Sequence, residues 1–235
     1  LIPEQDEEFD HYVNRMAESI NPNEDFCLLG YSFGGIIVQE IHKKIPAKKV
    51  IILASIKSPS GKSKLMEIGK RSKLYKIIPT SAFNENSYSF YSFVRHLFDP
   101  KNPKVLKYFK VRNPYYIKWS IEKILDWDAK ENPEIIQISA DKDIVFPIKN
   151  SNPNYVIKGG THLCPVTKAK EISAILEKEF GNKKEDKEVE KALRSGGGSN
   201  PNSKELRWKS ILRYKNKEGQ KFFNNVEEIE KIKIL

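Results

Sequence analysis

Hydrophobic residues follow two different periods in the first part of the chain. Between Asp6 and Ile20 the apolar positions are three or four residues apart, which predicts an amphipathic helix. Phe26 to Leu29 and Val50 to Ala54 are short continuous apolar runs, typical of strands buried on both faces of a parallel sheet. Because a helical pattern from Ile36 to Lys43 separates the two runs, we expect a right-handed strand, helix, strand crossover unit.

The pattern changes in the middle of the chain and then returns. Residues 57 to 131 are rich in lysine and aromatic residues at helical spacing, which predicts a helical insertion. Strand-like runs resume at Ile135 to Ile138 and Tyr155 to Ile157, and Val166 to Phe180 predicts a closing helix. We therefore expect an α/β core with a mostly parallel sheet, made of residues 1 to 56 and 132 to 180.

The end of the chain has a different composition. Residues 181 to 203 include the Gly- and Ser-rich run Ser195 to Ser203 and predict a flexible linker. Residues 204 to 235 then predict a small C-terminal appendage, in which Trp208 to Tyr214 and Lys221 to Phe223 flank a polar turn like a hairpin. Ile232 to Leu235 form part of this appendage or, alternatively, a further strand of the sheet.

Composition and charge limit the classes of protein to which the chain could belong. The 235 residues are 39% hydrophobic, enough for one substantial core. The net charge of +10 raises the question of a polyanionic partner, and Arg207 to Lys209 offers a basic and aromatic mixture. The lysines are spread along the chain, however, so we interpret them as a solvated surface and do not expect nucleic acid as a partner. No apolar run approaches the roughly 20 residues that span a bilayer.

The two cysteines indicate the compartment. Cys27 and Cys164 are far apart in sequence and form no CxxC pattern, so we expect neither a disulfide framework nor a zinc site. A reducing cytoplasm is the location that this pattern favours.

The strongest chemical motif is Gly30-Tyr31-Ser32-Phe33-Gly34, which has the form G-x-S-x-G between a predicted strand and a predicted helix. A serine hydroxyl is a weak nucleophile, so it must be lifted clear of the backbone and offered to a base. A tight strand-to-helix turn with small flanking residues achieves this. The alternative is that the glycines and the serine merely form a turn. The position between strand and helix favours Ser32 as the nucleophile.

A base for this serine must come from four histidines. His11, His42 and His96 fall within predicted helices, where a surface or packing role is the better interpretation. His162 instead follows Gly159 and Gly160 on a loop after a short predicted strand. Loops at the carboxyl ends of strands are where an open α/β sheet presents catalytic groups. We therefore predict His162 as the base, although a hydrogen-bonded loop histidine would show the same pattern.

An acid is needed to orient the imidazole, and the loop after Ile138 offers two. We predict that Asp143 fills this role and keep Asp141 as the second choice. Either residue could instead cap local N–H groups in a turn. The resulting chain order of nucleophile, acid and base differs from the orders of the chymotrypsin and subtilisin arrangements.

These motifs together resemble the α/β-hydrolase fold superfamily. The likeness covers roughly residues 1 to 180 and rests on the run from Gly30 to Gly35, the run from Asp141 to Pro147, and Gly159 to His162. Ser139-Ala140 stand where family members often have His-Gly. The resemblance implies that Asp143 is the acid, that residues 57 to 131 are a helical cap, and that the N–H of Phe33 contributes to an oxyanion hole.

Two functions remain open from the sequence, beside a less favoured third, a basic nucleic-acid-binding tail attached to a hydrolase-like body. The first is a serine hydrolase of the Ser-His-Asp type, acting on an ester, thioester or lactone as a small-molecule acyl substrate, with no cofactor or metal implied. Aromatic residues of the helical insertion suggest an apolar substrate or, alternatively, pack the insertion itself. The second is a non-catalytic scaffold. The family's N-terminal strands carry a loop with another oxyanion donor, and we expect this chain to begin beyond them.

Overall fold

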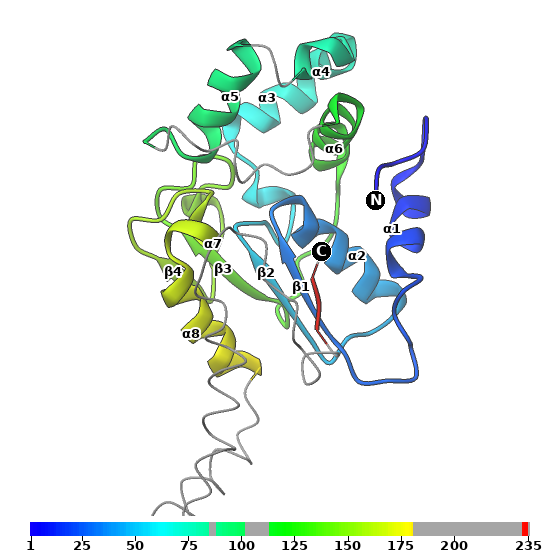
Figure 1. Ribbon diagram of the computed structural model, residues 1–235, viewed down its shortest axis with the longest axis vertical. Coiled ribbons are helices and arrows are strands. Elements are labelled where there is room, and N and C mark those ends of the chain that lie inside the picture. Colours follow the sequence, from blue (N-terminus) through cyan, green and yellow to red (C-terminus); the bar gives the residue numbers. More distant parts are fainter. Residues whose placement is uncertain (85–87, 102–112, 181–231, 235) are drawn as a thin grey trace, which may run out of the picture. The chain divides into compact units, whose positions relative to one another are not determined.

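The computed structural model describes residues 1–84, 88–101, 113–180 and 232–234 (Figure 1). It divides into two compact units, the first made of Leu1–Lys168 with Lys231–Leu235 and the second of Ala169–Glu230. The first unit contains a 5-stranded sheet with the strand order β4-β3-β2-β1-β5. All four strand pairs are parallel. The predicted α/β class with a parallel sheet is therefore confirmed.

The expected crossover unit occupies the start of the chain. Its elements are α1 (Phe9–Ala17), β1 (Cys27–Tyr31), α2 (Phe33–Lys44) and β2 (Lys49–Leu53). Helix α2 begins three residues before the predicted start at Ile36. Its first turn packs so tightly on the chain after β2 that a Cβ at Gly35 would lie 2.4 Å from the side chain of Ser55. Gly34 and Gly35, which the sequence placed in a turn, are thus already part of the helix, whereas Gly30 lies in β1.

Helices fill the described residues between β2 and β3, as the sequence predicts. We call residues 57–131 the helical segment. Figure 1 shows most of its helices above the sheet, beyond the end where Ser32 follows β1. Its elements are η1 (Pro59–Gly61), α3 (Lys64–Ser72), α4 (Leu74–Ile77), η2 (Thr80–Phe83), α5 (Tyr88–Phe98) and α6 (Pro114–Asp126).

The remaining strands follow the helical segment. They are β3 (Ile136–Ala140) and β4 (Tyr155–Ile157), with η4 (Ile148–Asn150) between them. The closing helix predicted for Val166 to Phe180 is confirmed as α8 (Ala169–Phe180). Its predicted start is wrong, because Val166 lies in a separate short helix, α7 (Cys164–Thr167). The two helices separate at Lys168, whose backbone angles (φ −125°, ψ 29°) leave the helical region. Helix α8 belongs to the second unit.

The C-terminal residues contribute a strand. β5 (Ile232–Ile234) lies parallel to β1, with Cys27 opposite Ile232 and Leu29 opposite Ile234. The alternative of a further sheet strand, left open by the sequence, is therefore confirmed for Ile232–Ile234. The predicted linker at 181–203 and the predicted hairpin from Trp208 to Phe223 lie outside the described residues.

The hydrophobic core lies between the sheet and the helices α1, α2 and α6. Leu28, Ile36, Ile41 and Ile52 are fully buried there, and Trp119 of α6 packs into the same cluster. Both cysteines are free thiols, so they form no disulfide, as the sequence indicates. Within the described ranges, every helix is too short or too polar to cross a bilayer. The core thus fixes the carboxyl ends of the strands, where the candidate residues follow.

Candidate active site

Ser32 occupies the turn between β1 and α2. Its backbone has φ 54° and ψ −119°, an unfavourable conformation for a residue with a side chain. Two hydrogen bonds hold it there: Ser32 N–H donates to the carbonyl of Leu53 (2.9 Å), and Gly35 N–H donates to the carbonyl of Ser32 (3.0 Å). A Cβ at Gly30 would lie 2.3 Å from the oxygen of Gly34, so the turn closes only with glycine there. The strained turn presents the serine hydroxyl at the carboxyl edge of the sheet.

His162 lies on the loop after β4 and reaches Ser32. Its Nε2 atom is 2.8 Å from the Oγ atom of Ser32, although 130 residues separate the two. The imidazole is fully buried. The strand order explains the meeting, because β4, β3, β2 and β1 are consecutive in the sheet and their carboxyl ends share one edge.

Asp143 completes a chain of hydrogen bonds. One of its oxygens, Oδ2, lies 2.8 Å from the Nδ1 atom of His162. The other, Oδ1, accepts the N–H groups of Val145 (2.8 Å) and Phe146 (3.1 Å). Both side chains of the Asp143–His162 pair are fully buried, where an unpaired carboxylate would be costly. Three hydrogen-bond donors therefore compensate the burial of the Asp143 carboxylate.

The other candidates from the sequence lie elsewhere. Asp141, the second choice for the acid, accepts the N–H of Gly159 at 2.7 Å. His11 of α1 contacts Glu7, which precedes that helix, and Nδ1 of His42 accepts the N–H of Ala47. His96 is exposed on α5. The structure thus brings together Ser32, His162 and Asp143.

Three aromatic rings surround the imidazole of His162. The rings of Tyr31, Phe98 and Phe146 lie at centroid distances of 5.4, 4.7 and 5.8 Å, and Phe98 meets the imidazole edge-on. The hydroxyl of Tyr31 donates to the carbonyl of His162 at 2.8 Å. Burial raises the pKa of Tyr31 well above its usual value, so the phenol stays a donor. These rings keep water away from most of the imidazole.

Sequence reasoning missed Tyr31 and Phe98 as residues of the site. Tyr31 could have been noticed, because it precedes the serine within the G-x-S-x-G motif. Phe98 carries no such signal, since α5 has several aromatic residues at helical spacing and nothing in that pattern selects one of them.

Phe33 directly follows Ser32, and its ring packs into the core. It is the first residue of α2, and N–H groups in the first turn of a helix have no partner within that helix. Its ring stacks on Phe9 (5.7 Å) and meets Trp119 edge-on (5.9 Å). Trp119 also lies 4.7 Å from Tyr12. Trp119 therefore packs against the α/β core, which is neither of the two roles that the sequence suggested for the aromatic residues of the helical segment.

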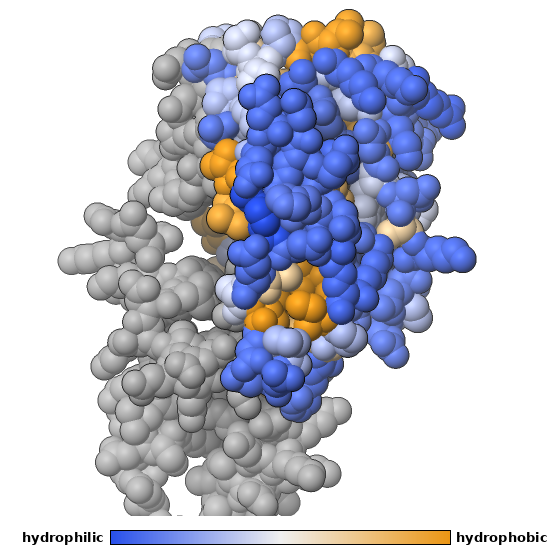
Figure 2. All heavy atoms as spheres, turned by 90° about the vertical axis from the view of Figure 1, so that its right-hand side faces the viewer, coloured by the Kyte–Doolittle hydropathy of each residue, from blue (hydrophilic) through white to orange (hydrophobic). Residues whose placement is uncertain are grey.

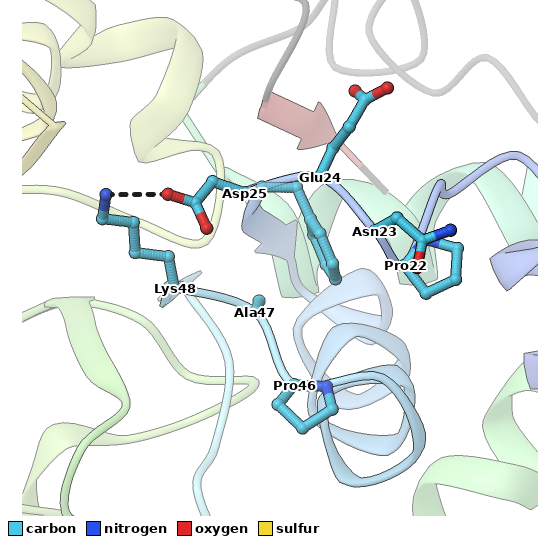
Figure 3. Close-up of a pocket in the computed structure, with 8 residues that line it drawn as sticks. Pro22, Asn23, Glu24, Asp25, Pro46, Ala47 and Lys48 are labelled. Carbon is cyan, nitrogen blue, oxygen red and sulfur yellow. Dashed lines mark hydrogen bonds and ion pairs between the residues drawn. The ribbon is translucent and has the colours of Figure 1, made fainter.

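A shallow cavity of about 330 Å³ opens far from these residues in the fold (Figure 3). It is lined by the chain just before β1 and just before β2, and Asp25 and Lys48 form an ion pair of 3.2 Å across its rim. It therefore lies at the amino ends of the strands, whereas open α/β sheets bind ligands outside the carboxyl ends. We assign it no role in the chemistry.

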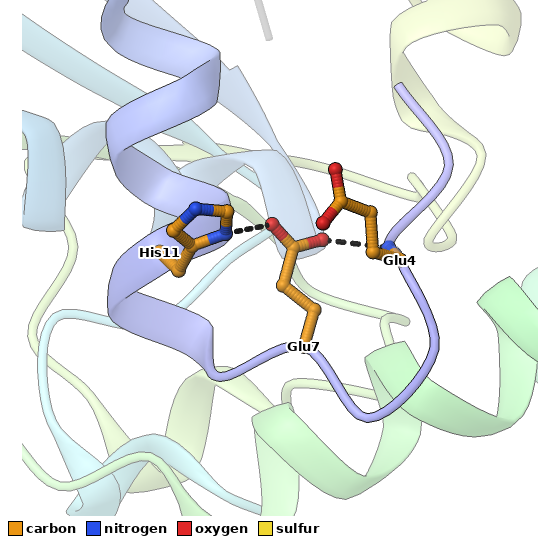
Figure 4. A group of neighbouring side chains, drawn as sticks. All are labelled: Glu4, Glu7 and His11. Atoms are coloured by element: carbon orange, nitrogen blue, oxygen red, sulfur yellow. Dashed lines mark hydrogen bonds and ion pairs between the residues drawn. The ribbon is translucent and has the colours of Figure 1, made fainter.

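Glu4, Glu7 and His11 form a cluster with the composition of a metal site (Figure 4). Nδ1 of His11 lies 2.6 Å from Glu7, and Arg15 pairs with Glu4 at 2.7 Å and with Glu7 at 3.0 Å. The guanidinium of Arg15 contacts both carboxylates, so ion pairs within the chain already hold the cluster together. We interpret it as an ion-pair network that ties the N-terminal segment to α1.

Comparison with known proteins identifies the fold. No protein-family model and no curated protein sequence matches the chain. A solved structure of a hydrolase from Pseudomonas aeruginosa PA01 is similar with a TM-score of 0.51 and 14% identity, over 74% of this chain and 71% of that one. A lipase-esterase related protein from Clostridium acetobutylicum has a TM-score of 0.49 at 16% identity, over 72% of each chain. The parallel sheet, its flanking helices and the first of these similarities show that the chain has the α/β-hydrolase fold.

Proposed function

We propose that the chain is a serine hydrolase that cleaves an ester, thioester or lactone with Ser32, His162 and Asp143. The observation that carries the proposal is one continuous chain of hydrogen bonds, from Ser32 Oγ to His162 Nε2 and from His162 Nδ1 to Asp143 Oδ2, each of 2.8 Å. The strained backbone of Ser32 adds support, because such strain persists at functional sites and is otherwise unfavourable.

In the proposed acylation step, Ser32 Oγ attacks the carbonyl carbon of the substrate and its proton passes to Nε2 of His162. Asp143 accepts from Nδ1–H, which leaves Nε2 free to act as the base and stabilises the imidazolium that forms. When the tetrahedral intermediate collapses, the bond to the leaving oxygen or sulfur breaks. His162 then returns the proton to that atom, and the acyl group stays on Ser32.

Deacylation repeats the sequence with water as the nucleophile. His162 takes a proton from the water, the hydroxide adds to the acyl carbon, and Ser32 Oγ leaves with the proton that His162 returns. The product is a carboxylic acid, and the enzyme regains its starting protonation. Every proton in these two steps has a donor and an acceptor among the three side chains, the leaving group and the water, so the steps as written balance without a metal or cofactor.

The charge that develops on the carbonyl oxygen needs hydrogen-bond donors. We assign the N–H of Phe33 to this role, at the N-terminus of α2, where the helix favours negative charge. We assign no second donor among the described residues. Because one donor contributes about 100- to 1,000-fold in turnover, we expect a slow enzyme with a competent nucleophile.

We further propose that the helical segment is a cap over the site. Phe98 of α5 meets the buried imidazole of His162 edge-on at 4.7 Å. Val94 of α5 and Ile117 of α6 pack against Leu163, the neighbour of His162. Contacts of this kind close the site to water and shape its substrate pocket.

Hydrolysis of p-nitrophenyl acetate and butyrate by the full chain tests the proposed function. We expect slow steady turnover that Ser32→Ala reduces to the background rate, because the acyl group has no other acceptor. Ser60→Ala is the matched control, since Ser60 lies in η1 and its hydroxyl bonds the hydroxyl of Ser58. Equal turnover by the wild type and Ser32→Ala would contradict the proposal.

A further inference from the structure

Helices α3 and α4 leave large apolar side chains in contact with solvent. Leu65, Ile68, Leu74, Ile77 and Ile78 are 68%, 63%, 58%, 77% and 38% exposed. We call these five residues the apolar face. Figure 2 shows an apolar area at the upper end of the molecule, at the height where Figure 1 places α3 and α4. Soluble proteins rarely expose such groups together unless the surface contacts another molecule.

The apolar face is not a misplaced part of the core. In α3, Leu65 and Ile68 lie on one side of the helix at a spacing of three residues. Met66 points the other way and packs against the hydrophobic core. In α4, Tyr75 is buried and its hydroxyl donates to Asp126 at 2.7 Å. Both helices therefore have an inward side that is already packed and an outward side that remains apolar.

Basic residues surround the apolar face. Between residues 64 and 78 there are five cations and one acid, Glu67, which gives a net charge of +4; the cations are Lys64, Lys70, Arg71, Lys73 and Lys76. A hollow of about 300 Å³ adjoins α3 and is lined by Pro59, Ser60, Lys62, Glu67, Lys70 and Arg71. This surface therefore combines apolar side chains, whose burial is favourable, with cations that can pair with phosphate groups.

We propose that the apolar face and its basic rim form a docking surface for anionic phospholipid membranes. The apolar side chains enter the boundary between headgroups and acyl chains, and the cations pair with the lipid phosphates and carboxylates. A second copy of the chain suits this surface less well, because the contact would bring two patches of +4 together. The proposal concerns peripheral binding and is independent of the hydrolase chemistry.

Co-sedimentation of the full chain with lipid vesicles tests the docking surface. We expect binding to phosphatidylcholine vesicles that contain about 30% phosphatidylserine, and weak binding to pure phosphatidylcholine. Raising the salt from about 0.1 M to about 0.5 M weakens the binding, because it screens the cations.

Two double variants separate the apolar and the electrostatic contributions. Ile68→Ser with Ile77→Ser, and separately Arg71→Gln with Lys76→Gln, are each expected to weaken vesicle binding by at least about tenfold. The matched controls are Val156→Ser with Val166→Ser, each 41% exposed on β4 and α7, and Lys130→Gln with Lys158→Gln. We expect both controls to bind like the wild type.

Four results would overturn the proposal. The first is no binding to the anionic vesicles, and the second is equal binding to both kinds of vesicle. The third is a dimer in sedimentation velocity without lipid that Ile68→Ser with Ile77→Ser abolishes, since the face would then be covered by a second copy of the chain. Loss of vesicle binding in the control variants as much as in the test variants would also contradict it.

Discussion

Two regions of the molecule break, in opposite directions, the usual rule that charged groups are exposed and apolar groups are buried. They are the carboxyl edge of the sheet and the pair of helices α3 and α4. At the sheet edge, the imidazole and the carboxylate of His162 and Asp143 are fully buried. On α3 and α4, leucine and isoleucine side chains are more than half exposed. The buried pair is compensated by hydrogen bonds, whereas nothing in the described residues covers the apolar side chains. Each departure is unfavourable for the isolated fold, and each is therefore a place to look for function.

The largest expected effect is on the buried side of this comparison. Asp143→Asn should lower the turnover of a p-nitrophenyl ester on the order of 1,000- to 10,000-fold, because the amide no longer holds the imidazole in the required tautomer. Asp141→Asn is the matched control, since Asp141 bonds the N–H of Gly159 and not the imidazole. Comparable losses in both variants would show that the loop, rather than the acid, matters.

Truncation of two isoleucines sharpens the contrast between core and apolar face. Ile52→Ala in β2 should cost about 2–5 kcal/mol in the free energy of unfolding, because Ile52 is fully buried. Ile77→Ala should change it by less than about 0.5 kcal/mol, since the side chain is 77% exposed. Urea denaturation measures both. A large loss at Ile77 would mean that the apolar face packs against a part of the chain itself.

A buried lysine where the helical segment meets the core is expected to make stability depend on pH. Nζ of Lys62 donates to the carbonyls of Leu125 (2.9 Å) and Trp127 (2.6 Å) at the end of α6. Burial lowers the pKa of Lys62 to about 8. Between this value and the unfolded value of about 10.4, the unfolded chain binds more protons, so the stability contributed at this site rises with pH.

Denaturation of the wild type and of Lys62→Met at pH 7.5 and pH 9.5 measures this dependence. We expect the difference in unfolding free energy to grow in favour of the wild type at the higher pH. Lys130→Met is the control, because Lys130 is exposed. A difference that shrinks with rising pH would contradict the assignment.

The smallest expected effect concerns the strain at the nucleophile. Ser32→Gly should raise the stability by about 1 kcal/mol, since glycine adopts a positive φ without the cost that serine bears. For a chain of this size that corresponds to a rise of roughly 2–4 °C in Tm. Ser60→Gly should give no rise, as Ser60 lies within the 3-10 helix η1. A lower Tm for Ser32→Gly would show that the turn is not strained.

The sequence predicts the sheet and the three residues that meet at its edge because both depend on local signals. Continuous apolar runs mark β1 to β4 to within two residues, and the loops that follow β1, β3 and β4 carry Ser32, Asp143 and His162. Features that depend on distant partners could not be predicted. The sequence left open a strand at Ile232 to Leu235, but nothing near Ile232 indicates that its partner is Cys27. The spacing of Leu65 and Ile68 resembles a buried helix face.

Covalent labelling by a fluorophosphonate, followed by peptide mass spectrometry, tests the central claim most directly. The probe reports an activated serine even where turnover is slow, because a single phosphonylation, in which the serine oxygen displaces fluoride, suffices. We predict one phosphonate per chain on the peptide that contains Ser32, no labelling of Ser32→Ala, and strongly slowed labelling of His162→Ala. Labelling of a different residue, or equal labelling of the wild type and Ser32→Ala, would contradict the assignment of Ser32 as the nucleophile.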